Sequence, residues 1–150
     1  MSGNQAALIG ASRPPTLLIN RSVDQQQTLP MLGYSANLRS TLSGALSANT
    51  LKSIYAVTGS GVLAFAAARA LDATSRNIRV YIVVDGTVVY DSTVSSIAAA
   101  NNGVVAVGLV DANGYTPIPF PFNTSLDIQI SSSIAETDKI SLDYYAWTTS

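Results

Sequence analysis

The dipeptide Asp85-Gly86 lies between two runs rich in Val, Ile and Tyr, and it constrains the fold of this chain more than any other feature. A two-residue type I′ turn needs positive φ at both central positions, and Asp-Gly is among the pairs that supply it. The segment from Arg79 to Ser92 therefore predicts a β-hairpin. The pairs expected from this turn are Val84 with Thr87, Val83 with Val88, Ile82 with Val89, and Tyr81 with Tyr90.

Apolar side chains occupy both faces of this predicted hairpin. Because successive side chains of a strand point to opposite faces, one face carries Tyr81, Val83, Val88 and Tyr90. The other face carries Val80, Ile82, Val84, Thr87 and Val89. One apolar face can cover the core of a sandwich, whereas the second needs another layer, a chain segment or a neighbouring subunit. We expect the face with Tyr81 and Tyr90 to lie in a subunit interface.

Residues 51–150 contain several more β-prone runs, separated by turns rich in Gly, Asn and Asp. The run SLDIQISS alternates apolar and polar residues, and the prolines of YTPIPFPFN exclude that segment from the middle of a sheet. The run VLAFAAARA is the weakest strand prediction, because alanine favours helices, but its flanking turns favour a strand. Seven or so short strands without a strand–helix–strand rhythm predict an all-β domain over 51–150, an antiparallel β-sandwich of jelly-roll type.

Residues 1–50 differ from the rest because strand periodicity is poor and amides and turn-forming residues are common. The alternatives are a disordered leader and an extended N-terminal arm, and the arm is favoured because disordered tails contain fewer apolar residues. Leu38, Leu42 and Leu46 recur at every fourth position, which suits one face of a short helix that Gly44 would weaken. The arm residues expected to contact a partner are Leu17, Leu18, Ile19, Arg21, Leu29, Met31, Leu32 and Tyr34.

The composition argues against several classes of protein. Charged residues make up 11% of the chain, against roughly a quarter in ordinary soluble domains, which indicates that much of the surface is covered. A net charge of −1 argues against a nucleic-acid partner, which normally meets a basic patch. The longest weakly polar run, YAVTGSGVLAFAAARAL, is too short and too interrupted for a membrane span, and the first residues lack the features of a signal peptide.

Residues suited to catalysis are sparse. The chain has no Cys and no His, which excludes Ser-His-Asp and Cys-His catalysis and thiolate or imidazole metal sites. We therefore expect no enzymatic activity, no metal, no cofactor and no small-molecule substrate. AETDK at 135–139 is expected to be a solvated turn, and DANG at 111–114 an Asx-type turn rather than a calcium loop. Tyr145 and Trp147 are expected to face away from the core, packed on a neighbouring strand or subunit or forming a sugar-binding platform.

The strand–DATSR–strand–DG–strand pattern and the closing ISLDYYAW, after an amide-rich leader, resemble small structural proteins of tailed bacteriophages. Within that group the chain looks most like the capsid cement, or decoration, proteins. The resemblance implies a homotrimer on the outer capsid surface of the virion, whose arm binds the major capsid protein and whose subunit interface includes Tyr145 and Trp147. The alternative within the same group is a tail-fibre or receptor-binding module that contacts a host glycan or protein through loops at 85–86, 101–103 and 111–114.

Overall fold

The computed structural model describes residues 38–99, 103–111 and 114–149. The chain divides into two units, Met1–Asn37 and Leu38–Ser150, and the account below concerns the second. Its described residues form antiparallel strands and no helix, which confirms the predicted all-β sandwich. No helix in this part of the chain is long and apolar enough to cross a membrane.

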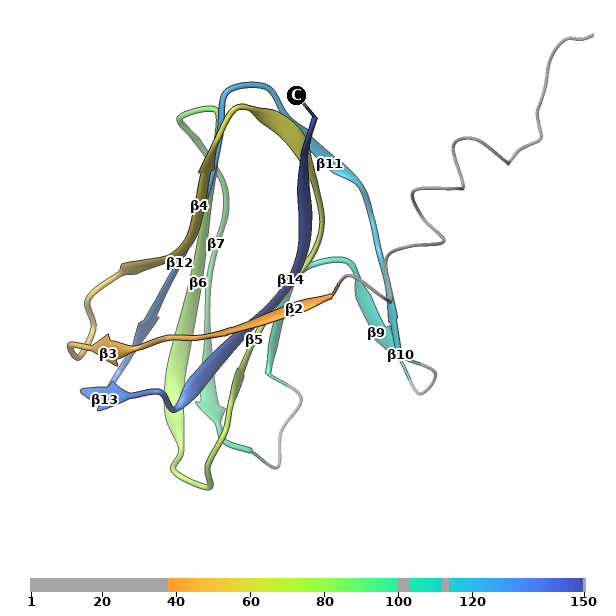
Figure 1. Cartoon of the computed structure of the whole chain (residues 1–150). Coiled ribbons are helices and arrows are strands. Elements are labelled where there is room, and N and C mark those ends of the chain that lie inside the picture. The colour runs from red at the N-terminus through yellow and green to blue at the C-terminus, as the bar shows by residue number, and fades with distance from the viewer. Residues whose placement is uncertain (1–37, 100–102, 112–113, 150) are drawn as a thin grey trace, which may run out of the picture. The chain divides into compact units, whose positions relative to one another are not determined.

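Two antiparallel sheets form the body of the unit, and they face each other in Figure 1. The first sheet has the order β4 (Lys52–Thr58), β12 (Ser125–Ser132), β6 (Arg76–Val84), β7 (Thr87–Ile97). The second has the order β11 (Phe120–Phe122), β5 (Ser60–Ala70), β14 (Ile140–Thr149), β2 (Arg39–Leu42). β8 (Val104–Val107) also pairs with β5, so β8 and β11 occupy successive parts of one edge of that strand.

Two small strand pairs form separate two-stranded sheets. β9 (Leu109–Asp111) pairs with β10 (Gly114–Thr116), and β3 (Ala45–Leu46) pairs with β13 (Glu136–Thr137). Figure 1 shows the β9–β10 pair beside the second sheet and the β3–β13 pair at one end of the sandwich.

The core lies between the two main sheets and follows the strand alternation. The first sheet contributes branched aliphatic side chains that water does not reach, and the second contributes small alanines beside larger residues of β14. Tyr144 stacks on Tyr55 across the sandwich, with ring centroids 4.3 Å apart. The fully enclosed core residues include Ile78, Val80, Ile82, Ile128, Ile130, Leu63, Ala66, Ala68, Ile140 and Leu142.

The alanine-rich run VLAFAAARA is confirmed as a strand, and it is central. β5 pairs with β14 along one side and with β11 and β8 along the other. Hydrogen bonding on both sides and the burial of Ala66 and Ala68 override the helical preference of alanine. As expected from its prolines, the segment containing β11 pairs along a single strand, β5.

The hairpin turn forms as predicted, with φ of 52° at Asp85 and 80° at Gly86. The pairs of Val84 with Thr87 and Val83 with Val88 are confirmed. The next two predicted pairs are wrong, because a β-bulge shifts the register and Tyr90 faces Ile82. The extra residue is Val89, and a bulge places two residues of one strand opposite one residue of the other.

The helix considered for Leu38, Leu42 and Leu46 is not formed. β2 hydrogen-bonds to β14 and β3 to β13, and only Leu46 of the three leucines is buried. An available strand edge outweighs a helical spacing that Gly44, at φ 67°, interrupts. The paired strands therefore begin at Arg39, inside the range that the sequence assigned to the arm.

Candidate interaction surface

The bulge at Val89 in β7 determines which apolar side chains of the hairpin lie on the outer face of the first sheet. It turns Tyr90 toward the core, where Tyr90 is partly buried and its hydroxyl donates to the carbonyl of Val105 over 3.5 Å. Of the four apolar residues that the sequence predicted on the outer face of the hairpin, Tyr81, Val83 and Val88 remain there and Tyr90 does not. The predicted common interface of Tyr81 with Tyr90 is corrected, since these two side chains leave β6 and β7 on opposite faces.

Polar residues surround those three apolar side chains on the outer face of the first sheet. Arg79 donates to both carboxylate oxygens of Asp91, at 2.7 and 2.8 Å, and its guanidinium lies 5.3 Å from the ring centroid of Tyr81. The hydrogen bonds from Arg79 lower the pKa of Asp91, and the same bonds raise the pKa of Arg79. This face meets water with hydrogen-bonding groups and one neutralised ion pair.

A polar hollow of about 210 Å³ lies at one end of this outer face. Arg79 contributes the guanidinium, and uncharged amides and hydroxyls form the rest of the lining. Such groups bind other polar groups through hydrogen bonds and hold no acid–base pair for chemistry. The lining residues are Asn49, Asn77, Arg79, Thr93, Ser131 and Ser133.

An apolar groove of about 240 Å³ opens where the edge of β7 approaches β8 and the segment before β11. Val89, the bulged residue, is 39% exposed, and Ile118 across the groove is 47% exposed. Phe120 belongs to the same lining and is also exposed. The full lining is Val89, Tyr90, Ala106, Val107, Gly108, Ile118 and Phe120. Exposed apolar side chains gathered in one groove make it a candidate contact site for another protein surface.

An aromatic cluster covers the outer face of the second sheet. Phe65 is buried beneath Tyr115 of β10, with ring centroids 4.7 Å apart, and Tyr145 meets Trp147 edge-on at 5.1 Å. Burial raises the pKa of the Tyr115 hydroxyl, and the nearby Tyr145 raises it further. Tyr145 and Trp147 leave β14 on the face opposite Tyr144, as the alternation predicts. Tyr145 is buried, so it offers no open sugar-binding platform.

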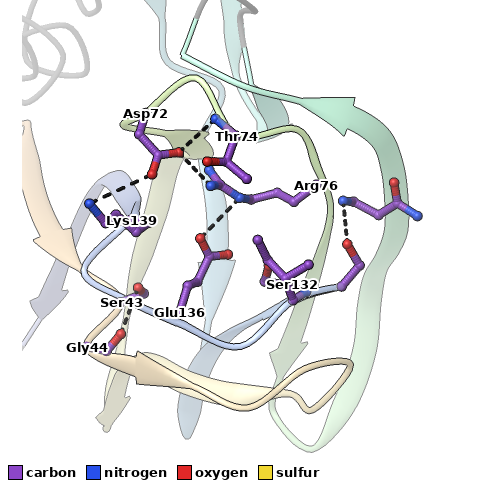
Figure 2. A network of polar contacts seen from close by, with 11 residues as sticks. Ser43, Gly44, Asp72, Thr74, Arg76, Ser132, Glu136 and Lys139 are labelled. Atoms are coloured by element: carbon purple, nitrogen blue, oxygen red, sulfur yellow. Dashed lines mark hydrogen bonds and ion pairs between the residues drawn. The ribbon is translucent and has the colours of Figure 1, made fainter.

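A buried ion cluster ties the turn after β5 to β13 (Figure 2). The side chain of Arg76 is 1% exposed and donates to Asp72 over 2.6 Å, while Lys139 lies 3.8 Å from the other oxygen of that carboxylate. The Nε of Arg76 approaches Glu136 Oε2 to 3.1 Å as an ion pair without hydrogen-bond geometry. The side chain of Glu136 is 6% exposed, so the expectation of a fully solvated turn at 135–139 is wrong at this residue.

The cluster is better explained as a structural tie than as a reactive centre. Arg76 joins the start of β6 to Asp72 in the preceding turn and to Glu136 in β13. Asp138 in the same turn accepts a hydrogen bond from the backbone of Gly44. Across residues 38–99, 103–111 and 114–149, no group of three or more acidic side chains is arranged to hold a metal ion.

The remaining predicted contact residues fall outside the part of the chain that the structure describes. They are Leu17, Leu18, Ile19, Arg21, Leu29, Met31, Leu32 and Tyr34. The predicted DANG turn also lies partly outside it, at positions 112–113. The groove residues Ile118 and Phe120 were not predicted, because their contact with the edge of β7 depends on how the two sheets pack. The alternating prolines around them were the one available signal of an exposed edge.

No protein-family model and no curated protein matches this sequence significantly. Among solved structures, a chain in "Structure of infectious bursal disease virus Gt strain" is similar at 16% identity with a TM-score of 0.26. The similar region covers 73% of this chain and 31% of that chain. A similarity at this level establishes neither a shared fold nor a shared function.

Proposed function

We propose that this chain is a structural virion protein that binds the outside of a phage capsid and clamps neighbouring major capsid subunits. The observation that carries the proposal is the apolar groove between β7, β8 and the segment before β11, where Val89 and Ile118 are exposed. This groove suits a protein–protein contact, because exposed apolar side chains are gathered in one place.

A mechanical role accounts for the other surfaces of the unit. The outer face of the first sheet presents hydroxyls, amides and one neutralised ion pair, which suit hydrogen-bonded contact with the surface of another protein. Clamping neighbouring subunits needs no titrating group, so the role requires no catalytic residue. In this proposal the residues from Leu17 to Tyr34 extend over the major capsid protein, and burial of their apolar side chains offsets the entropy lost on ordering.

Copy number in purified particles tests this function. Quantitative mass spectrometry of virions encoding this chain should find it in amounts comparable to the major capsid protein. A content of a few copies per particle would contradict a role across the capsid shell. Binding of the purified full-length chain to capsids that lack it should also saturate at a fixed ratio per capsid subunit.

The polar hollow beside Arg79 favours one alternative, a tail-fibre or receptor-binding module. Its amide and hydroxyl lining matches the hydrogen-bonding groups of a saccharide. That function requires a low copy number and saturable binding to host cells. Replacing Asn77 and Thr93 with Ala should then weaken cell binding, while a capsid protein of high copy number should show no binding to host cells at all.

A further inference from the structure

The middle of β7, Tyr90–Val94, presents a regular edge that is less protected than the other outer strands of the two main sheets. It is 11 residues long, contains no Pro or Lys, and carries one charged residue, Asp91, which Arg79 neutralises. At the opposite edge of the same sheet, β4 begins at Lys52 and is interrupted by a bulge. In the second sheet β2 has four residues and β11 contains Pro121. Charges, bulges, prolines and short strands prevent unwanted pairing at edges. β7 has a bulge near Val89 and a second one at Ser95–Ser96, and the stretch Tyr90–Val94 between them pairs regularly with β6.

We propose that β7 pairs antiparallel with β7 of a second copy of this chain, about a twofold axis at Ser92. This contact joins two first sheets into one continuous sheet of eight strands. The proposal goes beyond the capsid function and concerns association of the free protein. It replaces the threefold arrangement expected from the resemblance with a twofold one.

The register about Ser92 is favoured by the apolar residues of β7. It places Tyr90 opposite Val94 of the second copy, and the symmetry repeats this pair on the other side. Val94 faces Ile78 of the adjacent strand and is 36% exposed, and Tyr90 lines the apolar groove. Aromatic and β-branched residues opposite each other stabilise antiparallel strands. Because Tyr90 lines the groove, each Val94 would also cover one end of the other copy's groove.

The charges are complementary in the same register. It places Thr93 opposite Asp91 of the second copy, so the two Asp91 carboxylates do not face each other. Arg79 pairs with Thr93 in its own sheet. On the outer face, Thr93 then lies between Arg79 of its own sheet and Asp91 of the second copy, with each of the three residues on a different strand. Strands lie about 4.8 Å apart, so the long Arg79 side chain reaches past Thr93 toward a second carboxylate.

Cysteine cross-linking tests the contact and its register in the full-length chain, which contains no natural Cys. Ser92→Cys places two thiols opposite each other across the twofold axis, and mild oxidation should convert most of the protein to a covalent dimer. Ser95→Cys is the matched control, because in this register its two copies lie six residues apart along the strands, about 20 Å. Cross-linking of Ser95→Cys but not Ser92→Cys would overturn the proposed register.

Charge substitutions test the contact without a covalent bond. Thr93→Asp places a carboxylate opposite Asp91 of the second copy, and the symmetry does so twice. The dimer dissociation constant should rise roughly tenfold or more by sedimentation equilibrium. Thr93→Lys should preserve or strengthen the dimer, because Lys faces Asp91. Thr58→Asp makes the same change on an exposed residue of β4, at the opposite edge, and should leave the dimer unchanged.

The first test is the molecular mass of the wild-type protein in solution, measured by sedimentation equilibrium. A mass of two chains at micromolar concentration supports it, provided that Thr93→Asp shifts the mass toward one chain and retains the wild-type circular dichroism spectrum. A mass of one chain at high concentration overturns it. A mass of three chains overturns it as well and favours the threefold arrangement.

Discussion

The carboxylate of Asp85 accepts a hydrogen bond from the backbone N–H of Thr124 over 2.7 Å. The same carboxylate also accepts bonds from the backbone N–H groups of Asn123 and Ser125 and from the Thr124 hydroxyl. The turn between β6 and β7 is thereby fastened to the turn that leads into β12. The backbone N–H groups of Thr124, Asn123 and Ser125 lower the pKa of Asp85 from 3.8 to about 2.

Asp85→Asn should make the protein less stable at neutral pH and less sensitive to acid. The wild-type pKa is lower in the folded chain than in the unfolded chain, so the stabilisation is complete above pH 3.8 and is lost as the pH falls toward 2. Urea unfolding at pH 7, 4 and 2.5 measures this. Asn tolerates positive φ as Asp does, so the turn itself is preserved. A wild-type and a variant whose stability falls in parallel between pH 4 and 2.5 would contradict the assigned role.

Breaking the buried Arg76–Glu136 pair should destabilise the fold strongly. Arg76→Leu leaves the Glu136 carboxylate buried without its cation, and such a loss typically costs about 3–5 kcal/mol. The double variant Arg76→Leu with Glu136→Leu removes both charges and should recover much of that loss. Equilibrium urea unfolding of the single and double variants gives the coupling. Additive effects would show that the two groups do not interact.

Gly86 and Gly103 have nearly the same φ angle, 80° and 81°. Replacing each with Ala therefore adds similar backbone strain, and a difference in stability between the two variants reports steric conflict. A Cβ at Gly86 would meet no atom within 4 Å, whereas one at Gly103 would lie 2.3 Å from the carbonyl oxygen of Ala68. Gly86→Ala should therefore cost about 1–3 kcal/mol through strain alone. Gly103→Ala should cost more, because β8 must move away from β5. Thermal unfolding of both variants measures the difference, and equal losses would contradict the close packing of β8.

Deletion of residues 1–37 should leave a folded sandwich that no longer attaches to capsids. The described strands begin at Arg39, so this deletion removes none of them. Deletion of residues 1–46 removes β2 and β3 and should lower the unfolding temperature, because the outer edge of β14 and the edge of β13 lose their partners. Circular dichroism melting checks the fold, and co-sedimentation with capsids checks attachment. Retained attachment of the 38–150 fragment would falsify the role of the arm.

The sequence of this chain predicts its main turn and the inward-facing residues of one strand correctly. Asp85-Gly86 specifies a two-residue turn by its own backbone preferences, and alternation along SLDIQISS specifies which residues face the core. The turn and the alternation each depend only on residues that are close together in the sequence. The strand assignment of VLAFAAARA also succeeded, though on its flanking turns rather than on its own composition.

Only the tertiary structure decided the features that form the candidate interaction surface. The bulge at Val89 turns Tyr90 inward, and no glycine in β7 signals it. Leu42 and Leu46 take part in strand pairs because β14 and β13 offer free edges far away in the sequence. The Arg76–Glu136 pair likewise joins residues sixty positions apart. The sequence alone determined an all-β sandwich and its main turn, because these follow from local backbone preferences and side-chain alternation. The open β7 edge, the apolar groove and the buried ion cluster required the packed structure, because each depends on which distant strands become neighbours.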